Sequence, residues 1–137
     1  NIYITARLVN GEFPDYQQII PKEYQTNITT LTKDLVHALK KTNIFLNKFQ
    51  QLTLTTSQNE LILSSQNNEA GVTTETIKST IDGDEITLNF NQKYINEGIG
   101  HILDDSVVLK CAGVGRPLVM ENTHDKSIRY LVMPMNK

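Results

Sequence analysis

The sequence has few cysteines, no long apolar stretch and no excess of basic side chains, and each shortage excludes a class of protein. Cys111 is its one cysteine, so no internal disulfide can form, and we expect a reducing, cytoplasmic location. No apolar run approaches the roughly 18 residues of a membrane span, and no signal peptide is recognisable, so we expect no membrane partner. Lys and Arg number 13 against 15 Asp and Glu, and this net charge of -2 argues against a free-standing nucleic-acid binder.

The chain also lacks an initiator methionine, and it opens directly on the strand-like Ile2-Tyr3-Ile4. We therefore expect a piece of a longer gene product. Its 137 residues, 39% of them hydrophobic, are enough to build one core, so the sequence predicts a single domain over residues 1–137.

No group of residues typical of an enzyme is recognisable in the sequence. The three histidines, His37, His101 and His124, fall in three different expected elements. Cys111 lies near the end of an expected strand with no His or Cys at ligand spacing, which favours a buried structural thiol. An enzyme of this size usually shows at least one acid/base or metal cluster, so we expect a non-catalytic protein.

Two further patterns resemble ligand sites only superficially. The glycine-rich run Gly113–Arg116 precedes an expected strand, so no helix N-terminus is available there to receive a phosphate. The acidic turn residues lack the ligand order of a calcium loop, and solvated turns explain them better: Asp82, Asp84, Glu85, Asp104 and Asp105. The sequence therefore predicts no metal and no cofactor.

Apolar residues at helical spacing predict two helices. The first helix follows a polar loop over 22–30, begins after a cap at Thr30 or Thr32 and runs to about Leu46. Its apolar face consists of Leu31, Leu35, Ala38, Leu39 and Thr42. The second runs from Gln92 to about Ile102 with Asn91 as its cap, and its inner side is Tyr94, Ile95, Ile99 and Ile102.

Alternating apolar and polar residues, rich in Thr and Val, predict eight strands. They are expected at 2–8, 52–56, 60–65, 71–80, 85–90, 106–112, 117–121 and 128–133. The order is strand, helix, three strands, and then the same again. This tandem βαβββ order predicts an α+β fold with two four-stranded sheets and two helices packed together on one side.

The chain ends on an unusually apolar segment, Tyr130-Leu131-Val132-Met133-Pro134-Met135. Methionine is flexible and polarizable, and surfaces rich in it accept varied peptide partners. Together with Gly11–Tyr16, Ile20-Pro21 and Phe90-Asn91 with Tyr94, this tail resembles the C-terminal, third domain of the bacterial sliding clamp, the beta subunit of DNA polymerase III. These markers are spread over nearly the whole chain, and the tandem βαβββ order is also the plan of clamp domains.

The resemblance implies a non-catalytic subunit of the DNA polymerase III holoenzyme that acts as a processivity factor. Two full-length protomers would close head-to-tail into a homodimeric ring that encircles duplex DNA without sequence preference. The replicative polymerase subunit, the clamp loader and repair polymerases would bind through linear peptides. From the residues alone, a stand-alone peptide-binding or assembly module with a clamp-like fold and no DNA role stays open as the alternative.

The resemblance also implies this domain's share of a hydrophobic peptide-binding pocket. Plain core packing stays open as the alternative for Ile19 and Leu131. Gln18 and Asn136 stand where many relatives carry Arg, and Gly115 stands where a branched apolar residue is common, so we expect a less basic rim and a less filled wall. The matching residues are Pro14, Gln18, Ile19, Asn91, Tyr94, Gly115, Pro117, Leu131, Met133, Pro134, Met135 and Asn136.

Two more sites follow from the resemblance. Ile44 and Phe45 match the ring-closing edge, and both lie off the main apolar face of the first helix, so cover by a partner subunit would explain them. A helix that simply ends in the core is the alternative. Lys33, Lys40 and Lys41 suit a DNA-facing surface with loose phosphate contacts, although a solvated helix face predicts the same residues.

Overall fold

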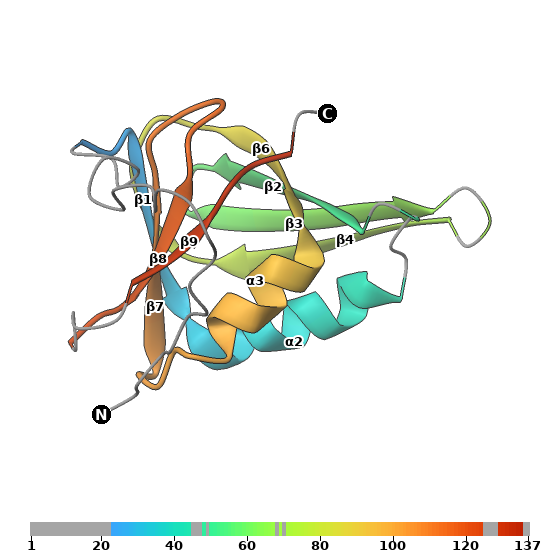
Figure 1. The fold of residues 1–137 in the computed structure, drawn as a ribbon, viewed down its shortest axis with the longest axis horizontal. Coiled ribbons are helices and arrows are strands. Elements are labelled where there is room, and N and C mark those ends of the chain that lie inside the picture. The colour runs from blue at the N-terminus through green and yellow to red at the C-terminus, as the bar shows by residue number, and fades with distance from the viewer. Residues whose placement is uncertain are drawn as a thin grey trace, which may run out of the picture.

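The computed structural model describes residues 23–44, 48, 50–67, 69, 71–124 and 129–135. Within these residues nine strands and two helices follow one another along the chain (Figure 1). They are β1 (Thr26–Leu31), α2 (Thr32–Asn43), β2 (Gln51–Ser57), β3 (Glu60–Asn67), β4 (Gly71–Lys78), β5 (Thr80–Gly83), β6 (Thr87–Asn91), α3 (Gln92–Ile99), β7 (Ser106–Cys111), β8 (Leu118–Asn122) and β9 (Arg129–Val132).

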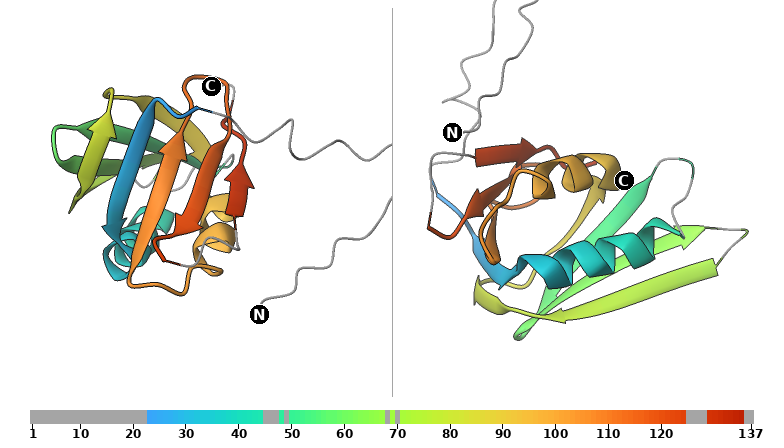
Figure 2. Two further views of the ribbon diagram at one scale, coloured as in Figure 1. Left: turned by 90° about the vertical axis from the view of Figure 1, so that its left-hand side faces the viewer. Right: turned by 90° about the horizontal axis from the view of Figure 1, so that it is seen from below.

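The described strands form two antiparallel sheets. The first sheet has five strands in the order β5-β1-β7-β8-β9, and the second has four in the order β4-β3-β2-β6. Helix α2 packs on β3 and β4 of the second sheet, α3 packs on β9 of the first, and the two helices contact each other (Figure 2). The predicted α+β fold class, with two sheets and two helices, is confirmed, and the βαβββ order holds for both repeats except that one strand of the first repeat is divided into β4 and β5.

Each sheet combines strands of both repeats: the first sheet takes β1 and β5 from the first repeat, and the second sheet takes β6 from the second repeat. β1 opens the first repeat but pairs with β7 of the second, and β6 opens the second repeat but pairs with β2 of the first. The two repeats are therefore joined by hydrogen-bonded ladders as well as by their helices.

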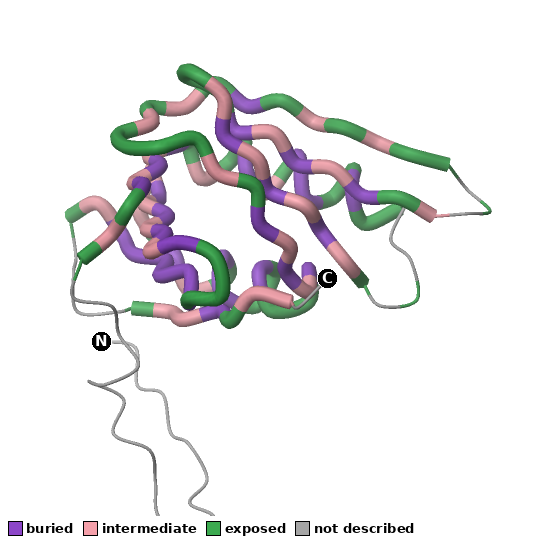
Figure 3. The backbone as a smooth tube through the Cα atoms, turned by 90° about the horizontal axis from the view of Figure 1, so that it is seen from above, coloured by how far each residue is buried: buried purple, intermediate pink, exposed green. Residues whose placement is uncertain are grey.

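Alternation along the strands places the core between the sheets and the helices. Leu52 and Leu54 on β2 and Leu61 and Leu63 on β3 are buried, whereas their sequence neighbours are partly exposed (Figure 3). Phe90 at the end of β6 is fully buried in the same cluster. Burial of such side chains stabilises each by roughly 1.5–3 kcal/mol relative to exposure.

The loop predicted over 22–30 is wrong, because β1 occupies Thr26–Leu31. Thr26, Ile28 and Thr30 alternate inward and are buried. Threonine fits a pleated surface well, but two polar residues on the inward face hide the alternation from a sequence pattern. The strand predicted over 2–8 lies outside the described residues.

The single strand predicted over 71–80 is divided at Ser79. Its first part, β4, pairs with β3, and its second part, β5, pairs with β1 of the other sheet. Ser79 donates its backbone N–H to the Asn59 carbonyl, 2.9 Å away, outside both ladders. The first sheet consequently has five strands where four were predicted.

The two helices begin differently. Neither Thr30 nor Thr32 caps α2: its N-cap is Leu31, which supplies no side-chain hydrogen bond, and the Thr32 hydroxyl instead donates to the Asp104 carbonyl at 2.8 Å. The predicted cap of α3 is confirmed, because the Asn91 side chain accepts from the Lys93 N–H at 2.9 Å. No helix in the described part of the chain is long and apolar enough to cross a membrane.

Candidate functional site

The C-terminal tail runs from one sheet to the other. After β9 ends at Val132, the backbone N–H of Met135 donates to the carbonyl of Asn89 on β6, 2.7 Å away. Met133 is 57% exposed, and Pro134 and Met135 are half-buried. The tail thus holds apolar side chains at the surface beside the last residues of β6, where α3 begins.

The start of α3 adds a further exposed apolar side chain. Tyr94 was predicted on the inner side of the helix, but it is 50% exposed. Gln92, Ile95 and Ile99 form the buried face at helical spacing, and Tyr94 lies off that face. Asn91 lies two residues after Asn89, so Asn91, Tyr94 and the tail come together at one place.

The loop between β7 and β8 reaches the same end of β9. Leu118, the first residue of β8, pairs with Val132, so Pro117 and Met133 leave the two strands at the same point. Pro117 is buried, and Gly115 is exposed with a φ of +79°. A branched side chain would be strained at that φ, which explains why glycine stands at this position.

Leu131 packs on the face of its sheet that is turned away from the helices. It pairs with Val119 and is half-buried, whereas its neighbours Tyr130 and Val132 contact the core. Plain core packing, the alternative weighed for Leu131, is therefore wrong. Pro14, Gln18, Ile19 and Asn136 lie outside the described residues.

Tyr130 fixes β9 against α3. Its ring stacks on His101 with centroids 5.9 Å apart, and its hydroxyl donates to Glu97 Oε2 at 3.4 Å. Burial, the Glu97 carboxylate and Tyr94 all raise the pKa of Tyr130. These contacts set where the following residues, Leu131 to Met135, leave the sheet.

Of the two residues predicted at the ring-closing edge, the structure describes Ile44, and this residue is strongly exposed. Ile44 follows the last residue of α2 and is 71% exposed, so the alternative that the helix ends in the core is wrong for this side chain. Val72 on β4, the edge strand of its sheet, is a second exposed apolar residue in the same half of the molecule. Phe45 lies outside the described residues.

The three predicted DNA-facing lysines are all exposed on α2 but do not form one cluster. Lys33 and Lys40 line a hollow of about 760 Å³ together with His37 and the segment 102–105. Lys41 instead lies 3.7 Å from Glu75 Oε1 on β4. Two of the three lysines therefore share one surface.

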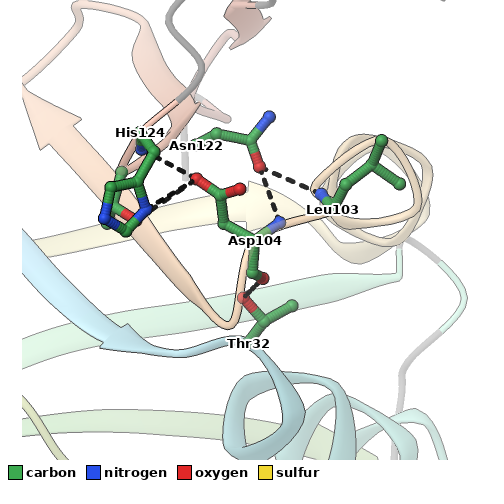
Figure 4. Close-up of polar contacts among 6 residues, drawn as sticks. Thr32, Leu103, Asp104, Asn122 and His124 are labelled. Carbon is green, nitrogen blue, oxygen red and sulfur yellow. Dashed lines mark hydrogen bonds and ion pairs between the residues drawn. The ribbon is translucent and has the colours of Figure 1, made fainter.

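Asp104 is a hydrogen-bonded turn residue and not the solvated one that was predicted. Its carboxylate accepts from the His124 N–H at 2.7 Å and lies 3.5 Å from His124 Nδ1 (Figure 4). The Asn122 side-chain oxygen accepts from the N–H groups of Leu103 and Asp104, at 2.9 and 3.0 Å. Among the described residues, no three His, Cys, Asp or Glu side chains come together in a way that could hold a metal ion.

The family model for the DNA polymerase III beta subunit, C-terminal domain, matches residues 17–136. The chain belongs to this family. The beta sliding clamps of Synechococcus elongatus and Vibrio cholerae are 28% and 27% identical over 136 and 132 residues. These alignments cover 97% and 96% of this chain but 36% of each relative, so the chain spans little more than a third of the length of these clamps.

Solved beta subunits have the same fold. The beta subunit of Thermotoga maritima superposes with a TM-score of 0.89 at 23% identity, over 96% of this chain and 36% of that protein. The beta subunit of Borrelia burgdorferi, solved in complex with a natural product, gives a TM-score of 0.86 at 26% identity, over 93% and 35% of the two chains. The chain is therefore a C-terminal beta-subunit domain. On one of its surfaces lie the C-terminal tail, Tyr94 and the β7–β8 loop.

Sequence reasoning missed the residues that hold this surface of the beta-subunit domain in place. Asn89 acts through its backbone carbonyl, for which a sequence pattern gives no signal. Gly98 is buried where α3 meets Tyr130, and its only signal is a glycine inside an otherwise helical pattern.

Proposed function

We propose that this chain is the third domain of a sliding clamp of bacterial DNA replication, a non-catalytic processivity factor of the cytoplasm. Two full-length protomers would close head-to-tail into a ring that tethers a polymerase to duplex DNA. Residues 1–137 would form one folded domain of that protomer. Membership of the beta-subunit family and the shared fold support this proposal.

The observation that supports the proposal most directly is the exposed apolar C-terminal tail, which lies beside the first residues of α3. Met133, half-buried Met135 and half-exposed Tyr94 offer an apolar surface that a short peptide can cover. The side-chain amide of Asn91 and nearby backbone groups can bond the backbone of that peptide, as polar groups do in ligand sites. Pro14, Gln18, Ile19 and Asn136 would complete this domain's share, and a neighbouring domain would supply the rest.

The occupants would be linear peptides of the replicative polymerase subunit, the clamp loader and repair polymerases. The isolated domain holds part of the pocket, so we expect it to bind such peptides weakly, with a Kd of about 10 μM to 1 mM. The full-length protein should bind the same peptides more tightly.

Substitution of Met133 tests the pocket. In the full-length protein, Met133→Ser should weaken binding of a polymerase-derived peptide at least about tenfold, because truncation of a central apolar contact commonly costs this much. Leu103→Ser is the matched control, since Leu103 is even more exposed, at 71%, but lies in the turn after α3, away from the tail. Fluorescence anisotropy with a labelled peptide gives the affinities, and equal effects of the two variants would contradict the proposal.

The DNA role would depend on ring closure and only weakly on direct contact. Even three lysines contacting three phosphates would give a salt slope of only about -2.7. Full-length protein loaded on a nicked circular plasmid should co-elute with it in gel filtration and dissociate once the plasmid is linearised. Submicromolar binding of short duplexes by the isolated domain in about 150 mM salt would contradict a topological hold on DNA.

A further inference from the structure

The face of the five-stranded sheet that is turned away from the helices carries a charge cluster around one buried carboxylate. On β8 this outer face bears Val119 and Glu121, which pair with Leu131 and Arg129 on β9. Leu118, Met120 and Asn122 alternate with them and point to the opposite face. Figure 2, left, shows β1, β7, β8 and β9 side by side in this sheet.

Glu121 is the centre of the cluster. It is 2% exposed, and its Oε1 lies 3.2 Å from Lys110 Nζ on β7 and 3.7 Å from Arg129 Nε on β9. Lys110 Nζ also lies 5.3 Å from the centre of the Tyr24 ring. A buried carboxylate is tolerated only when it is paired, and here two cations share one oxygen. The triad therefore carries a formal charge of +1.

That positive charge is presented beside the apolar surface of the tail. The Arg129 side chain is 49% exposed, whereas that of Lys110 is 26% exposed, so Arg129 is the more accessible cation. Alternate residues of a strand point to one face and are spaced by roughly 6.6 Å. Arg129 and Leu131 lie on the same face of β9 at this spacing, and Met133 follows two residues later.

We propose that Arg129, held in place by Glu121, selects peptides that carry a carboxylate two positions from an apolar anchor. An extended peptide along β9 has the same spacing between alternate side chains, so an anchor over Leu131 brings the carboxylate to Arg129. The guanidinium has five N–H donors in a planar fork that matches a carboxylate, which favours Glu or Asp over an amide. This inference rests on the peptide-binding function proposed above.

The test uses the full-length protein and three peptides of identical length. One has the pattern Glu-x-Leu-x-Leu, the second has Gln in place of Glu, and the third has the Glu moved next to the first Leu, where its side chain points to the other face. Exposed ion pairs are modest, so we expect about three- to fivefold tighter binding of the first peptide in about 50 mM salt. The difference should vanish in about 500 mM salt, and the third peptide should show no gain.

Variants of Arg129 show which cation is responsible. Arg129→Gln should bind the Glu and Gln peptides equally, with the affinity that the unsubstituted protein has for the Gln peptide. Arg129→Lys should keep part of the preference. Lys78→Gln removes an exposed cation of β4 in the other sheet and should keep all of it.

The Gln peptide separates the two proposals. If it binds and Arg129→Gln still prefers the Glu peptide, the role of Arg129 is overturned and the pocket stands. If neither the Glu nor the Gln peptide binds the unsubstituted protein, the pocket is overturned and the selectivity with it. Unchanged affinity of Arg129→Gln for the Gln peptide also shows that the fold is intact.

Discussion

Gly98 lies where α3 comes closest to β9. A Cβ added there would stand 2.5 Å from Tyr130 Cδ1 and 2.9 Å from Met120 Sδ, distances that atoms in folded proteins avoid. The ring of Tyr130 cannot withdraw easily, because it is stacked on His101 and hydrogen-bonded to Glu97. The close approach at this glycine therefore determines how near the tail-bearing strand lies to the helix.

Gly98→Ala should lower the free energy of unfolding by about 1–3 kcal/mol, the usual cost of overpacking. A loss of stability would point to the close contact, because helix propensity alone favours alanine over glycine by about 1 kcal/mol and would stabilise the variant. Gly100→Ala is the control: Gly100 is exposed, and its nearest neighbour would be 3.4 Å away. Urea denaturation gives both values, and a Gly98→Ala protein more stable than the parent would refute the close contact.

Cys111 is buried at the end of β7, and burial raises the pKa of its thiol to about 12 from the ordinary value of 9.0. The thiolate is the reactive form, so the folded protein should resist a thiol reagent at pH 8–9, whereas the urea-unfolded chain should react fully. The unfolded thiol ionises first, so the thiol's contribution to stability is complete below pH 9 and lost as pH rises toward 12. Rapid labelling of the folded chain at pH 8 would contradict this burial.

At the scale of elements, the turn between α3 and β7 depends on one amide side chain. Asn122 is 1% exposed, and its Oδ1 accepts two backbone N–H groups, those of Leu103 and Asp104. The same turn binds the start of α2 through Thr32. One residue of β8 thus links the end of one helix to the beginning of the other.

Asn122→Ala should leave both N–H groups without their acceptor and lower the free energy of unfolding by about 1–3 kcal/mol. Asn96→Ala, on the exposed side of α3, should change it by no more than about 0.5 kcal/mol. Amide hydrogen exchange adds a local measurement, since the Leu103 and Asp104 amides should exchange faster in Asn122→Ala alone. Equal exchange in the two variants would show that the turn does not need the side chain.

Elements with strong local signals were predictable, and those that depend on distant partners were not. Asn91 predicted the start of α3 correctly, because capping is a local interaction: the Asn91 side-chain oxygen accepts a hydrogen bond from the N–H group two residues later. β1 was missed because two of its inward residues are threonines, so the sequence shows no apolar alternation. Only the pairing with β5 and β7 buries these threonines. The division at Ser79 was missed because alternation continues through it, and only the pairing partners change. For the site, the tail and Tyr94 were recognisable, but the carbonyl of Asn89 was not.

At the scale of the whole molecule, the four-stranded sheet ends in an exposed edge. β4 is that edge, and Val72 on it and Ile44 beyond α2 are exposed apolar residues. An edge strand with apolar neighbours is suited to pairing with a second chain. We propose that ring closure in the full-length protein would cover this surface.

Ile44→Asp in the full-length protein should weaken dimerisation at least about tenfold, because a carboxylate would be buried without a partner. Val114→Asp is the control, since Val114 is 88% exposed in the β7–β8 loop, away from β4. Sedimentation over a range of protein concentrations gives both dissociation constants. Unchanged dimerisation of Ile44→Asp would place the interface elsewhere.

The exchange of β1 and β6 between the repeats has a consequence for synthesis. During synthesis β1 leaves the ribosome before β7, so the ladder from Thr26↔Cys111 to Leu31↔Ser106 cannot form until β7 is made. During that interval one side of β1 has no strand to pair with, and such an edge is prone to intermolecular pairing. Ladders between such distant segments also slow folding, commonly to milliseconds or seconds. Slower elongation through the second half of the domain would therefore lengthen the time for which this edge of β1 is unpaired.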